Sequence, residues 1–178
     1  PVMAAEPFDA VGNIGEGQRT ELELNLTLPL DRLGIPSGLV RTVAILRGSS
    51  ATDPTTGESR PISEDSPREV QIHFSQQLPR TRLRWGLDLT LASSSPEYYF
   101  DEVRTERLDT QLDVFAQYEP TPAWNLRLFA NNLTDRSAIR ERQIHDGLRS
   151  TAPLSYIETR TLNIGPYFGF IVRRTFGT

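Results

Sequence analysis

The chain of 178 residues contains no cysteine and no lysine. The absence of cysteine excludes disulfide scaffolds, cysteine-based zinc sites and catalysis by a thiol. All 19 basic residues are arginines, which we attribute to genome composition rather than to a mechanism. The 23 acidic residues are dispersed and give a net charge of -4, which argues against a strongly basic nucleic-acid binder.

Long hydrophobic runs are also missing. No stretch approaches the roughly 20 consecutive apolar residues of a membrane-spanning helix, so a helical membrane protein is excluded. A membrane β-barrel is compatible with this composition, because half of each barrel strand faces a polar lumen. No basic segment precedes an apolar run after Pro1, and we therefore expect a cytoplasmic protein, a mature chain or, in view of the strands below, a fragment.

Apolar and polar residues alternate along most of the chain. In residues 20–28 leucines occupy positions 22, 24, 26 and 28, and polar residues lie between them. A helix would scatter these leucines round its surface, so the period of two indicates a β-strand. Six further runs alternate: 39–47, 69–78, 82–91, 108–118, 124–145 and 156–176. The sequence predicts an all-β fold, an antiparallel up-and-down meander of about seven long strands.

The predicted connections alternate in length. Long or medium loops follow Arg47, Leu91 and His145, and the second of them is expected at residues 93–105; shorter turns follow Leu28, Leu78 and Tyr118. In a meander, alternate connections lie at the same end, so large loops gather at one end and tight turns at the other. This asymmetry is typical of outer-membrane barrels, and Trp85, Tyr118, Trp124 and Phe176 near the tight turns suit an interfacial girdle. A soluble sheet with one wet face would alternate in the same way.

The C-terminal part of the chain carries the most specific pattern. Residues 124–136 read WNLRLFANNLTDR, and the segments 139–142 and 157–160 flank a loop that contains Gly147. The final run places Phe168, Phe170, Val172 and Phe176 on one face. These features resemble the last two strands of TonB-dependent outer-membrane receptors and the terminal signal read by the barrel-assembly machinery. Residues 12–15 and 60–63 also look like this family.

The resemblance implies one part of a barrel of about 22 strands. Residues 18–178 would supply its C-terminal strands and residues 1–17 an outer loop segment, with the plug domain absent. Since seven strands leave two open edges, which lipid does not tolerate, we expect a fragment of a longer wall.

The implied parent protein imports a scarce, bulky nutrient across the outer membrane of a Gram-negative bacterium. An iron-siderophore complex, cobalamin or an oligosaccharide is expected, and the sequence does not distinguish among them. The implied partners are outer-membrane lipid, the plug domain, TonB acting through the missing N-terminal part, the barrel-assembly machinery and the small-molecule ligand.

Polar residues opposite the leucines are the candidates for ligand contact. The predicted lumen-facing set is Arg41, Arg47, Arg82, Arg84, Asp88, Asp113, Asn125 and Arg127. The resemblance implies that such walls contact the plug and the ligand; the alternative is that they hydrate the pore or pair across strands. The predicted loop aromatics Tyr98, Tyr99 and Phe100 would stack on a sugar or siderophore, or mark the outer membrane interface.

No pattern for catalysis or metal binding stands out. The only histidines, His73 and His145, belong to no cluster with metal-ligand spacing. The serines lack a Gly-x-Ser-x-Gly setting, and no phosphate loop or dinucleotide fingerprint occurs. We therefore expect no enzyme, no metal and no cofactor. Two other hypotheses stay open: a complete outer-membrane barrel of about eight strands with a structural or adhesive role, and a soluble β-sandwich binding module.

Overall fold

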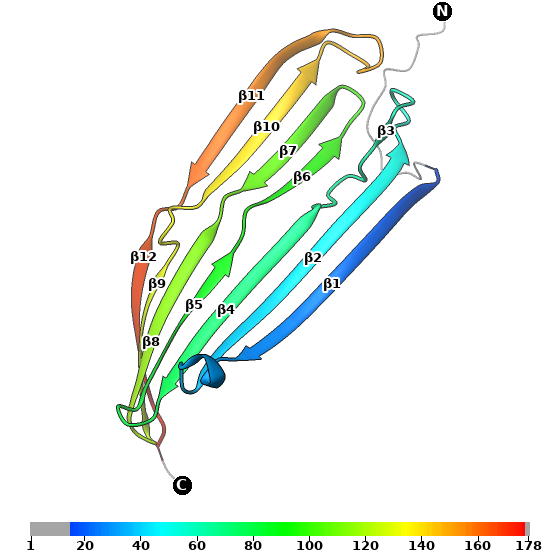
Figure 1. Cartoon of the computed structure of the whole chain (residues 1–178). Helices are drawn as coiled ribbons and strands as arrows, with labels where there is room; N and C mark the ends of the chain where they lie inside the picture. Colours follow the sequence, from blue (N-terminus) through cyan, green and yellow to red (C-terminus); the bar gives the residue numbers. More distant parts are fainter. Residues whose placement is uncertain (1–14, 177–178) are drawn as a thin grey trace, which may run out of the picture.

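The computed structural model describes residues 15–176, and most of them lie in antiparallel strands (Figure 1). The strands are β1 (Gly17–Pro29), β2 (Gly38–Thr52), β3 (Ser59–Arg60), β4 (Arg68–Leu78), β5 (Leu83–Thr90), β6 (Ser93–Tyr98), β7 (Glu102–Leu108), β8 (Gln111–Thr121), β9 (Trp124–Asn131), β10 (Ser137–His145), β11 (Leu154–Asn163) and β12 (Tyr167–Arg174). Within the described range the helical content is one 3-10 turn, η1 (Asp31–Leu33), and no helix is long and apolar enough to cross a membrane. The predicted all-β antiparallel class is confirmed.

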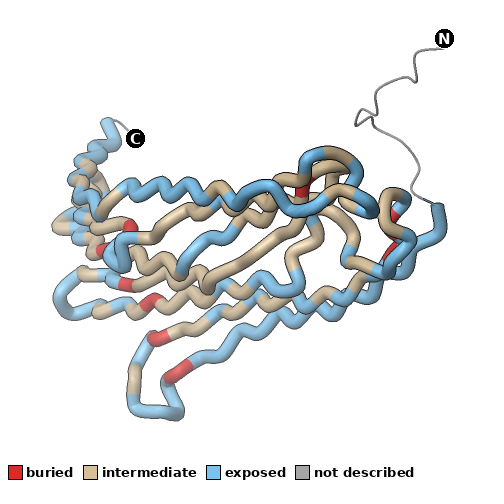
Figure 2. Tube along the Cα trace, turned by 90° about the horizontal axis from the view of Figure 1, so that it is seen from above, coloured by how far each residue is buried: buried red, intermediate tan, exposed pale blue. Residues whose placement is uncertain are grey.

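The strands form two sheets that follow one another along the same wall (Figure 1). The larger sheet has the order β1-β2-β4-β5-β8-β9-β12, with the short β3 paired to the end of β2. The smaller sheet has the order β11-β10-β7-β6. Because neighbours in the larger sheet follow chain order, its topology is the predicted up-and-down meander. The wall is curved and open: β1 forms one of its edges, and β12 and β11 form the other (Figures 1 and 2).

The chain crosses the wall seven times, but four crossings are broken in two. The breaks lie at residues 91–92, 109–110, 132–136 and 164–166. The prediction that 124–145 and 156–176 are continuous strands is therefore wrong. Asn132, Asp135 and Gly165 have positive φ angles of 57°, 53° and 78°, which take the backbone out of the extended region.

The predicted loop at 93–105 is wrong as well. Residues in this segment form the β6–β7 hairpin, in which Tyr98 pairs with Val103 and only residues 99–101 make the turn. Pro96 lies within β6. Proline is tolerated here because β6 is the edge strand of the smaller sheet, so its missing N–H leaves no partner unpaired. The predicted outer loop 1–17 lies outside the described residues up to position 14, and β1 already begins at Gly17.

The registers place the predicted apolar positions of the larger sheet on one face. One row of paired residues crosses all seven strands: Leu28, Val40, Phe74, Leu87, Val114, Ala130 and Phe168. The adjacent row belongs to the other face and contains Thr27, Arg41, His73, Asp88 and Asp113. The wall therefore has an apolar face and a polar face.

No packed core covers the apolar face. Among the described residues only Leu30, Ala51 and Phe115 are buried apolar side chains, and Phe115 belongs to the polar face (Figure 2). On the apolar face Leu22 is 63% exposed and Phe168 is 74% exposed. Single exposed apolar residues are ordinary, but a continuous apolar surface across seven strands requires a partner or an apolar solvent.

Candidate functional site

Seven of the eight predicted lumen-facing residues lie on the polar face of the larger sheet. They are Arg41, Arg47, Arg84, Asp88, Asp113, Asn125 and Arg127. Arg82 does not, because β5 begins one residue later and Arg82 lies in the preceding turn with a φ of 54°. Its guanidinium donates a hydrogen bond to the carbonyl of Pro120, and its own carbonyl accepts from the Glu119 N–H at 3.0 Å. Arg82 thus joins the β4–β5 turn to the end of β8.

The centre of the polar face is built round the buried ring of Phe115. The His73 ring is stacked with it, with 6.4 Å between centroids and 14° between planes, and the Arg127 guanidinium lies 4.3 Å from its centroid. His73 Nδ1 is 2.5 Å from an oxygen of Asp88. Three strands, β4, β8 and β9, therefore contribute to one stack of planar groups.

Two glycines make room for aromatic rings on this face. A Cβ on Gly86 would lie 2.3 Å from the Phe74 carbonyl oxygen and 2.8 Å from the Phe115 ring. A Cβ on Gly169 would lie 1.9 Å from the Phe129 ring. Each ring lies over the glycine with which it is paired on the neighbouring strand. The ring thereby covers a strand position that has no side chain of its own to pack.

The polar candidates divide into paired and unpaired groups. Arg47 contacts Glu21 at 2.7 Å on one side and Glu69 on the other, which links β1, β2 and β4. Asn125 donates to Glu119 at 3.0 Å. In contrast, Arg41, Arg84 and Arg127 form no ion pair with a carboxylate anywhere in residues 15–176. Within the predicted set, these three are the guanidiniums that a polar group could approach without displacing a carboxylate.

The segment 131–135, Asn-Asn-Leu-Thr-Asp, forms the junction between the two sheets. Asn132 is buried, its Nδ2 donates to the Gly165 carbonyl at 3.1 Å, and its Oδ1 accepts from the Arg136 N–H at 2.7 Å. Its own N–H donates to Asp113 at 2.7 Å, and the Thr134 hydroxyl donates to the Thr110 carbonyl at 2.6 Å. The motif thus bridges the breaks of three crossings, and Asp113 is occupied by this structural role.

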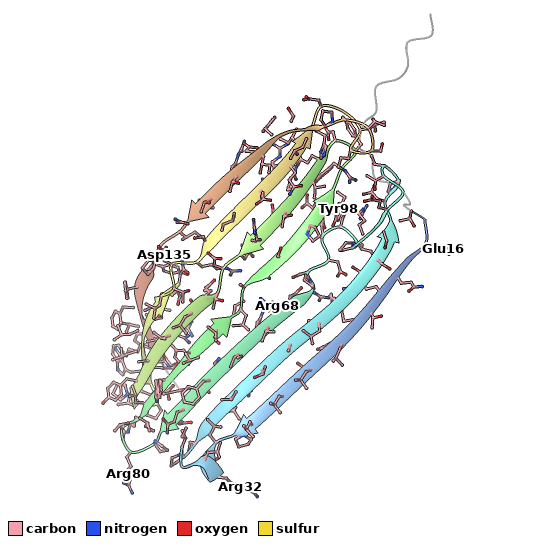
Figure 3. The ribbon with its side chains drawn as sticks, turned by 45° about the horizontal axis from the view of Figure 1, so that its top comes forward. Glu16, Arg32, Arg68, Arg80, Tyr98 and Asp135 are labelled. Atoms are coloured by element: carbon pink, nitrogen blue, oxygen red, sulfur yellow. The ribbon has the colours of Figure 1, made fainter. Side chains whose placement is uncertain are left out.

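The end of the wall opposite the tight turns at Arg32 and Arg80 carries Tyr98, the first of the predicted aromatics (Figure 3). Tyr98 is the last residue of β6, and the guanidinium carbons of Arg60 and Arg149 lie 4.2 and 5.8 Å from its centroid. The Phe100 carbonyl accepts from the Arg149 N–H at 2.9 Å. The protein's own arginines therefore already contact this tyrosine.

Tyr99 is held by charged neighbours. Its hydroxyl donates to Glu97 at 2.6 Å and accepts from Arg104 at 3.1 Å, while the Arg104 guanidinium lies 4.8 Å from its centroid. The hydrogen bond to Glu97, followed by burial, raises the pKa of Tyr99 above its ordinary value. Tyr99 is thus a neutral donor at physiological pH.

An alternating ladder of arginines and carboxylates crosses the smaller sheet, and the sequence analysis did not find it. Arg142 contacts Glu102 and also Glu158 at 2.9 Å, and Glu102 contacts Arg104 at 2.9 Å. The Arg142 hydrogen bond lowers the pKa of the buried Glu102 against the effect of burial. The sequence signal was present, since opposite charges recur at alternate positions of β7, β10 and β11, but only the registers show which strands adjoin.

The predicted assembly signal lies at the open edge. Phe168, Phe170 and Val172 project from the apolar face of β12, which pairs only with β9 within the described residues. Phe176 follows the strand, and the Arg174 guanidinium lies 4.5 Å from its ring and 5.1 Å from that of Trp124. The arginine thereby holds two aromatic rings at the tight-turn end.

No protein-family model, curated protein or solved structure was found that matches this chain. Within residues 15–176 no group of three or more histidine, aspartate or glutamate side chains is arranged to hold a metal ion.

Proposed function

We propose that the chain is part of the wall of a transmembrane β-barrel. The observation that carries this proposal is the apolar face, which continues through all seven crossings and on which no part of residues 15–176 is packed. A soluble domain buries such a face in its core, whereas in a barrel hydrocarbon covers it and the polar face lines the lumen.

The two ends of the wall support the same proposal. Trp85, Tyr118 and Trp124 lie near the tight turns and are about 40% exposed, as suits an interfacial girdle. The opposite end carries the ion-paired strands of the smaller sheet. A band of apolar residues between an aromatic rim and a charged outer end is the distribution expected of an outer-membrane wall.

Within this class we favour a TonB-dependent receptor of a Gram-negative outer membrane. Its support is the resemblance of residues 124–176, together with the joint that the Asn132 segment forms between the sheets. In this proposal further strands continue the wall beyond β1 and β12, and the polar face meets the plug domain and the ligand. The parent protein imports an iron-siderophore complex, cobalamin or an oligosaccharide, with energy supplied through TonB.

The two other hypotheses require contacts that residues 15–176 lack. A closed barrel made by this chain alone needs β1 and β12 to be joined, and each has only one neighbour in the larger sheet. A soluble sandwich needs a second layer on the apolar face, and the smaller sheet follows the larger one along the wall (Figure 1).

Adjacent single-cysteine variants test the barrel proposal; these 178 residues have no native cysteine, and any cysteine elsewhere in the intact protein would be replaced by serine. The variants Leu26→Cys and Asn25→Cys, in the intact protein reconstituted in vesicles, would each carry the same fluorophore. We expect brominated phospholipid to quench the label at position 26 and aqueous iodide to quench the label at position 25. Iodide quenching at both positions, without lipid quenching, would contradict the proposal.

Uptake in whole cells then tests the receptor assignment separately. Cells that express the intact gene would be given cyanocobalamin, a ferric siderophore or a maltooligosaccharide. We expect accumulation of one of these to be lost both when this gene is deleted and when TonB is deleted. If the labels show a lipid-facing wall but deletion of the gene leaves accumulation of all three compounds unchanged, the barrel proposal stands and import of these substrates is contradicted.

A further inference from the structure

Asp53 is only 2% exposed, although it lies in the connection between β2 and β3. One oxygen of its carboxylate accepts hydrogen bonds from Arg60 Nε at 2.9 Å and from Arg149 Nη2 at 2.6 Å. The other oxygen accepts from the N–H groups of Thr55 at 2.8 Å and Thr56 at 3.3 Å. A buried carboxylate that is fully hydrogen-bonded and flanked by two guanidiniums is a specific, directional contact rather than a solvated surface charge.

The partners of Asp53 come from separate connections at the outer end. Arg60 belongs to β3, and Arg149 lies in the β10–β11 connection, 96 residues from Asp53. Arg149 also donates through Nε to the Tyr99 carbonyl at 2.6 Å, which adds the β6–β7 turn. Both guanidiniums lie on the Tyr98 ring. We call Asp53, Arg60, Tyr98 and Arg149 the outer latch.

Other contacts hold the neighbouring segment independently of the latch. The Glu64 N–H donates to the Pro96 carbonyl at 2.8 Å, and the Tyr98 N–H donates to Ser63 Oγ at 3.3 Å. These bonds attach residues 61–66 to the free edge of β6 and do not involve the β10–β11 connection. Of the three buried apolar residues, only Ala51 lies at this end. The side-chain tie between the 53–58 connection and the 146–153 connection therefore runs through Arg149.

We propose that the outer latch is a conformational device that holds the three outer connections as one body, and that its release separates residues 146–153 from residues 53–58. The inference rests on these contacts alone and holds whether or not the wall belongs to a transporter. In a barrel wall, the latch would determine how far the outer connections open over the lumen.

A distance measurement across the latch tests this inference. Spin labels on Glu58→Cys and Ser150→Cys, both exposed positions in a chain without cysteine, report the separation of the two connections in the intact protein. We expect a narrow distance distribution in the parent and a broader, longer one after Asp53→Asn. Amide exchange within 146–153 should accelerate about a hundredfold, as when one partner of a buried ion pair is removed.

A matched control removes a carboxylate of equal charge from an exposed ion pair in the smaller sheet. Glu106 pairs with Arg140, and their side chains are 41% and 49% exposed, so Glu106→Gln should leave distance and exchange unchanged. If Asp53→Asn fails to fold, Arg149→Met decides by the same two readouts. An unchanged label distance and an unchanged exchange rate in the folded variant would overturn the inference. Failure of both variants to fold would overturn it too, because the cluster would then stabilise the whole wall and not the outer connections alone.

Discussion

Four crossings of the chain contribute a strand to each of the two sheets, but the two sheets are stabilised differently. The larger sheet separates an exposed apolar face from a polar face, and its two buried apolar side chains within residues 15–176, Ala51 and Phe115, lie on the polar side. The smaller sheet is covered by ion pairs between neighbouring strands, such as those of Arg142 with Glu102 and Glu158. The larger sheet suits hydrocarbon on one face, and the smaller sheet suits water, where arginine and carboxylate side chains retain hydration.

The largest loss of stability is expected when a charge is placed on the apolar face of the larger sheet. In vesicles, Leu26→Arg should lower the free energy of unfolding by about 2–4 kcal/mol, because a guanidinium on the lipid face loses its hydration. The neighbouring Asn25→Arg, on the polar face, should have little effect. Urea unfolding of both variants measures the difference, and equal stabilities would refute a lipid-facing surface.

A smaller effect is expected where the larger sheet brings aromatic rings over glycine. Gly86→Ala should cost about 1–3 kcal/mol, because the added methyl group meets both the Phe74 carbonyl and the Phe115 ring. Gly48→Ala is the matched control, since a Cβ at Gly48 meets nothing within 4 Å. Unfolding of the two variants under identical conditions should rank Gly86→Ala as the less stable one, and the reverse order would contradict this packing.

The substitution Asn132→Gly tests which interactions hold the junction between the two sheets. Glycine keeps the positive φ but removes the side-chain bonds to Gly165 and Arg136, so we expect a loss of about 1–2 kcal/mol. Asn132→Ala should lose more, because alanine is strained at this φ. Equal stability of the parent and the glycine variant in urea unfolding would show that backbone conformation alone forms the joint.

Acid should loosen the outer latch while leaving the larger sheet unchanged, and this difference requires no mutation. Burial raises the pKa of Asp53, but hydrogen bonds from Arg149 and the Thr55 N–H outweigh it and hold the pKa below its ordinary value of 3.8. A depressed carboxyl pKa contributes stability above the ordinary value and loses it as the pH falls through the folded-state value. We therefore expect no change at the outer latch from pH 8 to about 5, and loosening only at pH values below 3.8, because the pKa of Asp53 in the folded protein is lower than that ordinary value.

The pH prediction is measured with the spin labels at positions 58 and 150, compared with a label pair on the larger sheet. Arg60, Arg149 and Tyr98 are the charged or titratable groups that face Asp53, and the arginines stay charged throughout this range. The distance distribution between positions 58 and 150 should broaden in acid, while that of the label pair on the larger sheet should stay the same. Loosening already at pH 6 would assign the transition to another group.

Alternation alone was enough to predict the class of fold and the faces of the larger sheet. Leucines at positions 22, 24, 26 and 28 can share a face only in an extended strand, and the registers confirm that face across the sheet. The breaks in the crossings were not predictable in this way. Asn132 and Asp135 take up positive φ angles that their sequence permits but does not require, and the bonds of Asn132 to Asp113 and Gly165 hold it there.

In the candidate site, too, some features follow from the alternation of the sequence and others depend on tertiary contacts. Periodicity alone placed Arg41, Arg84 and Arg127 on the polar face, because the side-chain direction of a strand residue follows from its position. Tertiary structure decided which polar residues are already paired, and it brought Asp53 to Arg149 across 96 residues of chain. Local preference sets the conformation of a strand and its faces, whereas a contact between distant connections exists only when the registers of the intervening strands bring the two side chains together.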